Sequence, residues 1–332
     1  MTRLHPNTLN ELQADIEVPT YDRVRLGAGI VHLGLGAFHR AHQAVYTDDA
    51  ISNSGGDWGI IGVSMRSATV AEQLRPQHGL YSVLSEDASA SRLRVVGAIT
   101  EVLVAPEQPE AVVAAIARQD IQVLTLTITE KGYALAGDGQ TLDLQSAAIV
   151  QDLGNPQQPR SAIGLLALGL QQRLAAGGAP LTLLSCDNLS GNSLVLRAVL
   201  ADYLQRAFPA VIPWLETATT FPCSMVDRIV PAMTAARLQH QVEQLGLQDA
   251  GAVSTEPFSQ WIIEDNFAAG RPDWVSAGVQ LVSDIAPFET MKLQMLNAAH
   301  SAIAYGGLLA GLNTVDEVMA DAELGTYIDR LM

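Results

Sequence analysis

The chain has 332 residues, of which 48% are hydrophobic and 16% charged, so its length and composition predict about two globular domains. A formal net charge of −16 argues against nucleic acid or a membrane surface as a partner, and two cysteines exclude a disulfide framework. Because the N-terminus lacks an apolar secretory signal and no run is long enough to cross a membrane, we expect a cytoplasmic protein.

From residue 27 onward, short apolar runs alternate with stretches of helical periodicity. The runs are almost continuously apolar, which is typical of strands covered on both faces. This alternation predicts right-handed βαβ units in an α/β, doubly wound, Rossmann-like parallel sheet. We expect strands at 30–34, 58–64, 121–127 and 181–185, and helices near 42–52, 109–118, 162–176 and 193–205.

Other segments predict further strands and a helical C-terminal part. Residues 81–85 and 92–97 indicate an antiparallel insertion, and the runs 252–256, 259–264 and 276–283 indicate a further mixed sheet. Pro287 is expected to open a helix that continues to about Gly311, with helix again to the chain end. Because the chain stops inside this helix-rich region, we expect the mostly helical C-terminal domain to be truncated.

A strand, a glycine turn and a helix start follow one another between residues 30 and 40. The two glycines allow backbone N–H groups to approach a pyrophosphate at the helix N-terminus. His39 takes the third glycine position of the usual G-x-G-x-x-G, so the alternative is a turn that merely joins strand to helix. We favour a dinucleotide site and assign cofactor binding to Gly34, Gly36, Ala37, Phe38, His39 and Arg40.

The second strand should end with an acid that holds the ribose diol of NAD. Here it is followed by Arg66 and Ser67, and no acid occurs before Glu72. Arg66 is therefore a candidate cofactor residue that would accept a 2′-phosphate, or it is a solvated surface arginine. We expect NAD as cofactor, with NADP left open.

The histidines near this turn do not predict a metal centre. His39 and His42 stand three residues apart, but no third ligand is spaced to join them, and zinc usually needs three or four. We therefore expect no metal. Residues 1–284 should form a dinucleotide-binding domain with an N-terminal extension and inserted strands, and 285–332 should begin a helical substrate or catalytic domain.

Polar residues lie at the end of one further predicted strand and within residues 221–231. Asp187 and Asn188 close the strand at 181–185, where doubly wound folds place ligand contacts. Asn188 would donate its amide N–H to an alkoxide, although a helix cap is the common role of Asp and Asn at such a position. Asp227 and Arg228 are adjacent, and a structural ion pair is their simplest interpretation.

Residues 292–300 place a lysine, an amide and an imidazole in one apolar segment with helical spacing. Around an α-helix, Asn297 lies about 140° and His300 about 80° from Lys292. We expect this face to be buried, so that desolvation lowers the pKa of Lys292 toward the range of a general base. The alternative is a lysine that extends to solvent beside two satisfied polar groups. The same arc carries Leu293, Leu296 and Ile303.

Several of these stretches together resemble the mannitol dehydrogenase family, the polyol-specific long-chain dehydrogenases. The resemblance covers residue 30 to the chain end, and 221–231, 261–267 and 270–274 are most similar to members that interconvert fructuronate and mannonate. The motifs are 34–42, 129–133, 185–188, 225–228, 256–258 and the Lys-Asn-His set at 292, 297 and 300.

This resemblance implies a dinucleotide-binding domain and a helical domain with the active site between them. It implies that a lysine base and two amide donors act on the reacting oxygen, while other residues contact substrate or lie on a proton path. The implied residues are Lys292 as base, Asn188 and Asn297 as donors, His300 and Asp227 at the substrate, and Glu289 on the proton path.

Alcohol oxidation needs a base and donors that stabilise the developing alkoxide, and the lysine and the two amides meet both needs without a metal. We expect a metal-independent, nicotinamide-dependent oxidoreductase of a small sugar acid or polyol, with fructuronate and mannonate as the expected pair. The alternatives are a mannitol 2-dehydrogenase or arabinitol dehydrogenase, and a dinucleotide-binding protein without turnover because its pocket is incomplete.

Lys131 bears on the substrate class. A uronate carries a carboxylate, and a buried carboxylate requires a cation. Lys131 lies just past an apolar strand and is expected to bind that carboxylate, whereas the alternative is a surface lysine paired with Glu130.

Overall fold

The structure is a computed structural model that describes residues 2–87 and 90–331. The chain divides into two compact units, and the boundary lies between Ser283 and Asp284. The predicted domain boundary lies one residue further along the chain. Among the described residues, no helix combines the length and apolar character needed to cross a membrane.

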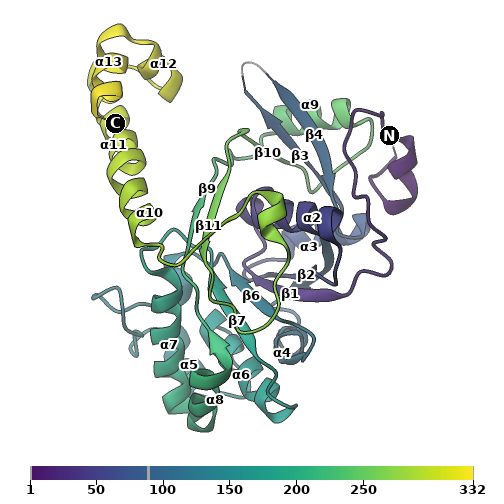
Figure 1. Ribbon diagram of the computed structural model, residues 1–332, viewed down its shortest axis with the longest axis vertical. Helices are drawn as coiled ribbons and strands as arrows, with labels where there is room; N and C mark the ends of the chain where they lie inside the picture. The colour runs from purple at the N-terminus through teal and green to yellow at the C-terminus, as the bar shows by residue number, and fades with distance from the viewer. Residues whose placement is uncertain (1, 88–89, 332) are drawn as a thin grey trace. The chain divides into compact units, whose positions relative to one another are not determined.

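A parallel sheet of six strands forms the centre of the first unit (Figure 1). Counted in chain order among themselves, its strands lie in the order 3-2-1-4-5-6, which is the order of dinucleotide-binding doubly wound sheets. The predicted fold class is therefore confirmed. From one edge to the other the strands are β5 (Ile99–Val104), β2 (Gly59–Ser64), β1 (Ala28–Leu33), β6 (Val123–Leu126), β7 (Leu181–Ser185) and β8 (Thr219–Thr220).

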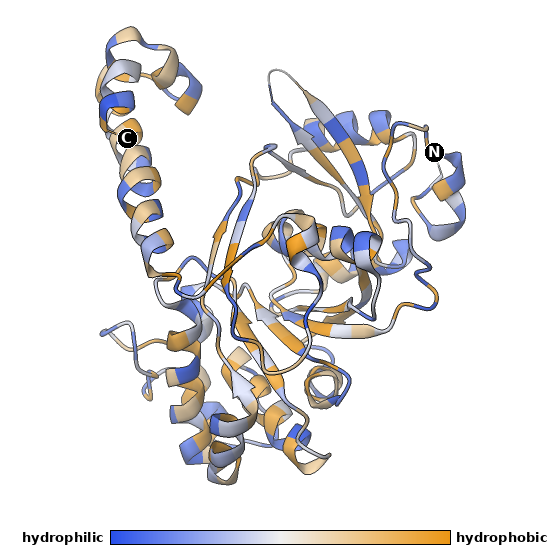
Figure 2. Ribbon diagram, in the orientation of Figure 1, coloured by the Kyte–Doolittle hydropathy of each residue, from blue (hydrophilic) through white to orange (hydrophobic). Residues whose placement is uncertain are grey.

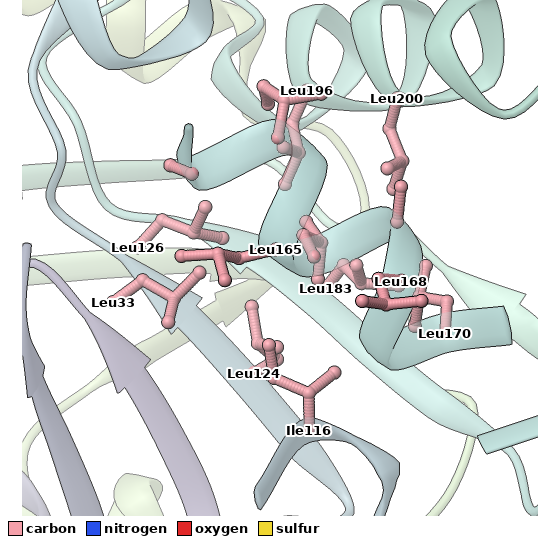
Figure 3. Packing of buried hydrophobic residues seen from close by; sticks show 14 of the residues in the cluster. Leu33, Ile116, Leu124, Leu126, Leu165, Leu168, Leu170, Leu183, Leu196 and Leu200 are labelled. Atoms are coloured by element: carbon pink, nitrogen blue, oxygen red, sulfur yellow. The ribbon is translucent and has the colours of Figure 1, made fainter. Parts of the chain in front are cut away.

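Both faces of this sheet are buried, as the continuous apolar runs predicted. Val31 and Leu33 of β1 pack into one core, and Ile30 packs into the other. Figure 3 shows leucines from the strands meeting those of the covering helices, and Figure 2 shows hydrophobic residues along the strands. The first core includes residues of α4 (Pro109–Ala117), α5 (Ala147–Gly154), α6 (Ala162–Ala175), α7 (Asn192–Ala207) and α8 (Ile212–Ala218), and the second those of α1 (Ala37–Ala41), α2 (Gln43–Ser54) and α3 (Thr69–Leu74).

Two three-stranded sheets complete the first unit, together with α9 (Ala235–Leu245). The predicted antiparallel insertion is present as β3 (Tyr81–Glu86) and β4 (Ser91–Val96). The mixed sheet contains β9 (Ser224–Asp227), β11 (Gln260–Glu264) and β12 (Gln280–Val282).

The expectation that residues 252–256 belong to this mixed sheet is wrong. They form β10 (Val253–Thr255), which pairs in parallel with β3. The buried Asp249 accepts hydrogen bonds from the backbone N and the Oγ of Ser82, at 2.6 and 2.7 Å. Because an unsatisfied buried carboxylate is costly, this contact holds the chain before β10 against the start of β3.

The second unit is helical and has a small core. The helix expected from Pro287 to Gly311 is present, but a π-helical segment, η6 (Lys292–Asn297), interrupts it. Four buried residues, Ala299, Ile303, Val318 and Ile328, form the core. The α-helices are α10 (Ala286–Met291), α11 (Ala298–Ala310), α12 (Val315–Ala320) and α13 (Ala322–Leu331).

Candidate functional site

At the carboxyl end of β1, Gly34 contacts residues at the ends of both neighbouring strands, β2 and β6. Gly34 has a φ of +103°, and a Cβ added there would lie 2.2 Å from the carbonyl oxygen of Thr127. The N–H groups of Gly34 and Leu35 both donate to the Val63 carbonyl of β2 at 2.9 Å. The Thr127 hydroxyl, just past β6, donates to the Gly34 carbonyl at 2.9 Å. A residue with a side chain cannot replace this glycine without separating β1 from β6.

Gly36 leaves the turn open to a ligand. It is the N-cap residue of α1, and the nearest atom to a Cβ built there is the Gly34 carbonyl oxygen, 3.7 Å away. The first N–H groups of α1, beginning with the exposed Ala37 and the half-buried Phe38, have no acceptor within the helix. An anion such as a pyrophosphate therefore fits this turn, which lies beside the point where the strand order reverses between β1 and β6.

The side chains of His39 and Arg40 face the protein interior. His39 is 1% exposed and stacks on His32 with ring centroids 3.4 Å apart. The Arg40 guanidinium donates to the carbonyls of Gly36 and Gly251 and lies over the ring of Tyr81. The two buried side chains support the turn from the protein interior. At these positions only the backbone can therefore contact a ligand.

A chain of hydrogen bonds joins His32 to the glycine turn. His32 Nδ1 lies 2.8 Å from the Thr125 hydroxyl and Nε2 lies 2.9 Å from that of Thr127. Because the single Thr127 proton goes to Gly34, Nε2 must be the donor to Thr127, and Nδ1 then accepts from Thr125. Burial lowers the pKa of His32 to about 3, and burial with the neighbouring His32 holds the pKa of His39 well below its usual range. Both imidazoles are neutral at neutral pH.

Asp187, at the end of β7, fixes the loop that follows β6. Its carboxylate accepts from the N–H groups of Ile128 and Thr129 at 3.0 and 2.8 Å and from the Tyr133 hydroxyl at 2.7 Å. Burial raises the pKa of Asp187, and the hydrogen bond from Tyr133 acts in the opposite direction. The aspartate is thus a positioning residue at the carboxyl edge of the sheet.

The loop held by Asp187 contains a strained residue. Thr129 has φ 65° and ψ 161°, a region that is almost restricted to glycine. The short helix η3 (Glu130–Tyr133) follows it and exposes Lys131 to solvent. The alternative pairing of Lys131 with Glu130 is not found, because no ion pair joins these two described residues.

Neither Asp187 nor Asn188 caps the following helix, so that alternative is wrong. Helix α7 begins at Asn192 with Gly191 as its N-cap residue. Asn188 is exposed at the carboxyl end of β7. The buried Asn192, which sequence reasoning missed, donates to the carbonyls of Asp187 and Ser224 at 3.0 and 2.8 Å and so ties β7 to β9.

Asp227 and Arg228 do not form the expected structural ion pair. Half-buried Asp227 ends β9 opposite Gln260. Arg228 instead donates to the Thr255 hydroxyl at 2.9 Å and to the carbonyl of Ala41. Arg228 therefore does not neutralise the Asp227 carboxylate.

At the end of β2, Arg66 is exposed beside Ser67, whose carbonyl accepts from Ser64 Oγ at 2.7 Å. No described carboxylate lies within 4 Å of Arg66. The first unit thus brings the turn, Arg66, the Lys131 loop and Asn188 to the carboxyl edge of one sheet.

The second unit carries the remaining candidates on η6 and its neighbours. A π-helix joins residues five apart, so Lys292 and Asn297 lie closer around the axis than the 140° of an α-helix. The expected burial of this face is wrong in part. Lys292 and Asn297 are half-buried, as is Glu289 before them, but Leu293 is 52% exposed and His300 is exposed, because the small core of this unit does not reach them.

Within residues 2–87 and 90–331, no three His, Cys, Asp or Glu side chains gather as metal ligands. The candidate positions carry an anion-binding turn, side-chain amides and a lysine. Sequence reasoning missed Thr127, Thr129 and the role of Asp187, because each depends on contacts between separate strands that leave no local pattern.

Comparisons with known proteins cover nearly the whole chain. Residues 28–276 match the sequence model of the mannitol dehydrogenase Rossmann domain, and residues 284–332 match that of the mannitol dehydrogenase C-terminal domain. D-mannonate oxidoreductase of Escherichia coli is 42% identical over 95% of this chain and 65% of the relative. Mannitol 2-dehydrogenase of Phaeosphaeria nodorum is 38% identical over 99% of this chain and 59% of the relative. The chain spans less than two thirds of the length of these curated relatives.

A solved structure of mannitol 2-dehydrogenase from Pseudomonas fluorescens, a ternary complex with NAD and D-mannitol, is also similar. It is 36% identical with a TM-score of 0.92, and the match covers 99% of this chain and 68% of that chain. Substrate-free D-sorbitol dehydrogenase is 37% identical with a TM-score of 0.93, over 99% of this chain and 68% of that chain.

We predict that Thr129→Gly stabilises the protein. Glycine adopts this backbone conformation without strain, and after its greater entropy in the unfolded chain is subtracted, a gain of about 1 kcal/mol in the free energy of unfolding remains. Urea denaturation measures it. Thr129→Ala is the matched control, because it keeps the Cβ and should bring no gain. A glycine variant less stable than the wild type would show that residue 129 is unstrained, because only the entropy cost of glycine would then remain.

We predict that His32 makes stability fall in mild acid. The folded state keeps His32 neutral down to a pKa of about 3, whereas the unfolded chain takes up a proton near 6.5. This contribution is complete above pH 6.5 and decreases by about 1.4 kcal/mol for each unit below it. His32→Gln should therefore lose less stability than the wild type between pH 6.5 and 4.5. The exposed His240, replaced by Gln, is the control and should leave the wild-type slope unchanged.

Proposed function

The chain belongs to the mannitol dehydrogenase family, and from this premise we propose that it transfers a hydride between a nicotinamide cofactor and a secondary alcohol of a sugar acid or polyol. The observation that carries the proposal is the 3-2-1-4-5-6 sheet with the open turn at Gly36 beside its point of reversal. Support also comes from the exposed Asn188 at the neighbouring strand end and from the Lys292 segment of the second unit.

The residues of the first unit fit a dinucleotide. The backbone from Gly34 to His39 would hold the pyrophosphate, and Arg66 would lie near the ribose at the end of β2. When bound, the nicotinamide supplies the hydride chemistry. NAD is the cofactor we propose, with NADP as the second possibility because Arg66 stands where an acid is usual for NAD.

Protein groups would manage the proton and the oxygen charge. In oxidation Lys292 accepts the hydroxyl proton, and in reduction it returns the proton to the same oxygen. Asn188 and Asn297 donate N–H groups to that oxygen as its negative charge develops. His300 and Asp227 orient substrate hydroxyls, and Glu289 conducts the proton to solvent.

For the substrate, we propose fructuronate and its reduction product mannonate. Lys131 is exposed at the carboxyl edge of the sheet and has no ion pair with Glu130, so it is available to a substrate carboxylate. The alternative is a neutral polyol, as in the relatives named mannitol 2-dehydrogenase. The chain has only two lysines, Lys131 and Lys292, and the proposal gives a task to each.

We predict that Lys292→Ala lowers the rate of alcohol oxidation by about 10²–10⁴ through the loss of proton transfer, while NADH binding persists. The pH dependence of the wild-type rate should follow the titration of the Lys292 ammonium. In a Lys131→Arg variant, Lys292 is the only lysine of the chain. ¹³C-labelled lysine therefore gives a single side-chain NMR signal that follows this titration. Near wild-type turnover in Lys292→Ala would contradict the assignment. Cofactor binding without turnover on fructuronate, mannonate, fructose or mannitol would favour a binding protein.

We predict that Lys131→Gln lowers kcat/KM for fructuronate about 10- to 100-fold, since it removes one charged hydrogen bond to the carboxylate. Rates on fructose and mannitol should change little, and Lys131→Arg should retain most of the fructuronate activity. Steady-state absorbance of the nicotinamide measures all three substrates. An equal loss on charged and neutral substrates would favour the polyol alternative.

We predict that Arg66→Gln weakens NADPH binding about tenfold or more and leaves NADH binding unchanged, because only NADPH carries the 2′-phosphate. Fluorescence titration with each nucleotide measures the two dissociation constants without turnover. If both constants stay at their wild-type values, Arg66 is a solvated surface residue.

A further inference from the structure

One cavity of the first unit is lined by more positive than negative side chains, although the chain as a whole is negatively charged. A cavity of about 370 Å³ is lined by residues of helix α2, the strands β3 and β4, and the segment before β11. Its wall contains three arginines, Arg92, Arg94 and Arg228, and one carboxylate, that of Asp49. In a protein of net charge −16, this local excess of cations requires an explanation.

The acidic partners of this cluster face a different hollow. Glu17, Asp48 and Asp49 line a neighbouring cavity of about 340 Å³, together with Arg94. Arg94 and Asp49 stand in the wall between the two hollows, because they line both. Most of the arginines therefore line the first cavity, and most of the carboxylates line the second.

Two of the three arginines are neutralised within the protein. Arg94 Nη2 pairs with Asp48 at 2.9 Å and with Asp49 at 2.5 Å. Arg92 pairs with Glu17 through two parallel hydrogen bonds. Both oxygens of Asp49 accept hydrogen bonds from Arg94, whose single positive charge is shared between Asp49 and Asp48.

Arg228 keeps its charge. Its guanidinium donates only to neutral oxygens, those of the Thr255 hydroxyl and the carbonyls of Ala41 and Glu256. No described carboxylate lies within 4 Å of it. Burial lowers the pKa of Arg228, and the nearby Tyr46 and Asp49 act in the opposite direction without an ion pair.

Further polar groups lie in the same wall. Arg94 Nε is buried and makes no hydrogen bond with any described residue, and buried donors are normally satisfied. The Ser259 hydroxyl interacts with Tyr46, whose pKa it acts to lower. Tyr46 adds a phenolic hydroxyl to the wall.

We propose that this cavity binds a small oxyanion, a phosphate or a carboxylate, which pairs with Arg228 and accepts a hydrogen bond from the Ser259 hydroxyl. The fork of a guanidinium matches the oxygens of either group. The volume falls in the range of small-molecule sites and exceeds the needs of an inorganic ion, so the ligand is a small organic anion. The apolar body would contact Val45, Val83 and Pro257.

Isothermal titration calorimetry tests this inference without reference to turnover. Inorganic phosphate, glycerol 3-phosphate and gluconate are titrated at constant ionic strength, with NADH saturating so that the glycine turn is occupied. We expect saturable binding of at least one probe. Tighter binding of the phosphate ester than of gluconate identifies a phosphate ligand, and the reverse identifies a carboxylate.

Variants locate the binding. Arg228→Gln should weaken it about 10- to 100-fold and Ser259→Ala about tenfold, since each removes a donor to a charged acceptor. Ser259→Ala also covers the case in which the arginine variant does not fold. Arg75→Gln is the matched control, because Arg75 lines a different hollow and likewise donates to neutral oxygens, those of Val102 and Gln108. Absence of saturable binding, its loss with NADH, or equal binding by wild type and Ser259→Ala would overturn the proposal.

Discussion

Strands β1 and β6 approach so closely at their carboxyl ends that residue 34 has no room for a side chain. The Thr127 carbonyl occupies the space where a Cβ would stand, and the same two residues are joined by a hydrogen bond. This contact sets the distance between the two strands at the point where the strand order reverses. Since Arg66, Lys131 and Asn188 all lie on the edge that this contact closes, their spacing depends on a glycine that touches none of them.

Buried polar groups then hold the geometry that the glycine permits. His32 supports the turn through Thr127, and Asp187 supports the loop that follows β6 through three hydrogen bonds. Fully satisfied networks of this kind specify one arrangement, because any alternative leaves a polar group unpaired in a medium of low dielectric. The strain at Thr129 persists for the same reason, since the carboxylate of Asp187 holds its N–H group in place.

The sequence predicted elements whose pattern of burial repeats along the chain. It did not predict features that depend on contacts with residues distant in sequence. Strand 181–185 was predicted to the residue, because burial on both faces leaves a continuous apolar run. Buried polar contacts of Asp249 and Gln241 with Ser82 join the region of β10 to β3, and no periodicity reports them. Helical spacing also could not distinguish an α-helix from the π-helical turn at Lys292, and it assumed that Leu293 would be covered.

The scarcity of lysine has a practical consequence for handling the protein. Apart from the α-amino group, amine-reactive dyes, cross-linkers and resins find only Lys131 and Lys292, both of which belong to the proposed site. The two thiols, Cys186 and Cys223, are buried and give no alternative handle. Coupling through amines would therefore attach a label or a surface at the two proposed functional groups, so a genetically added tag is the appropriate point of attachment.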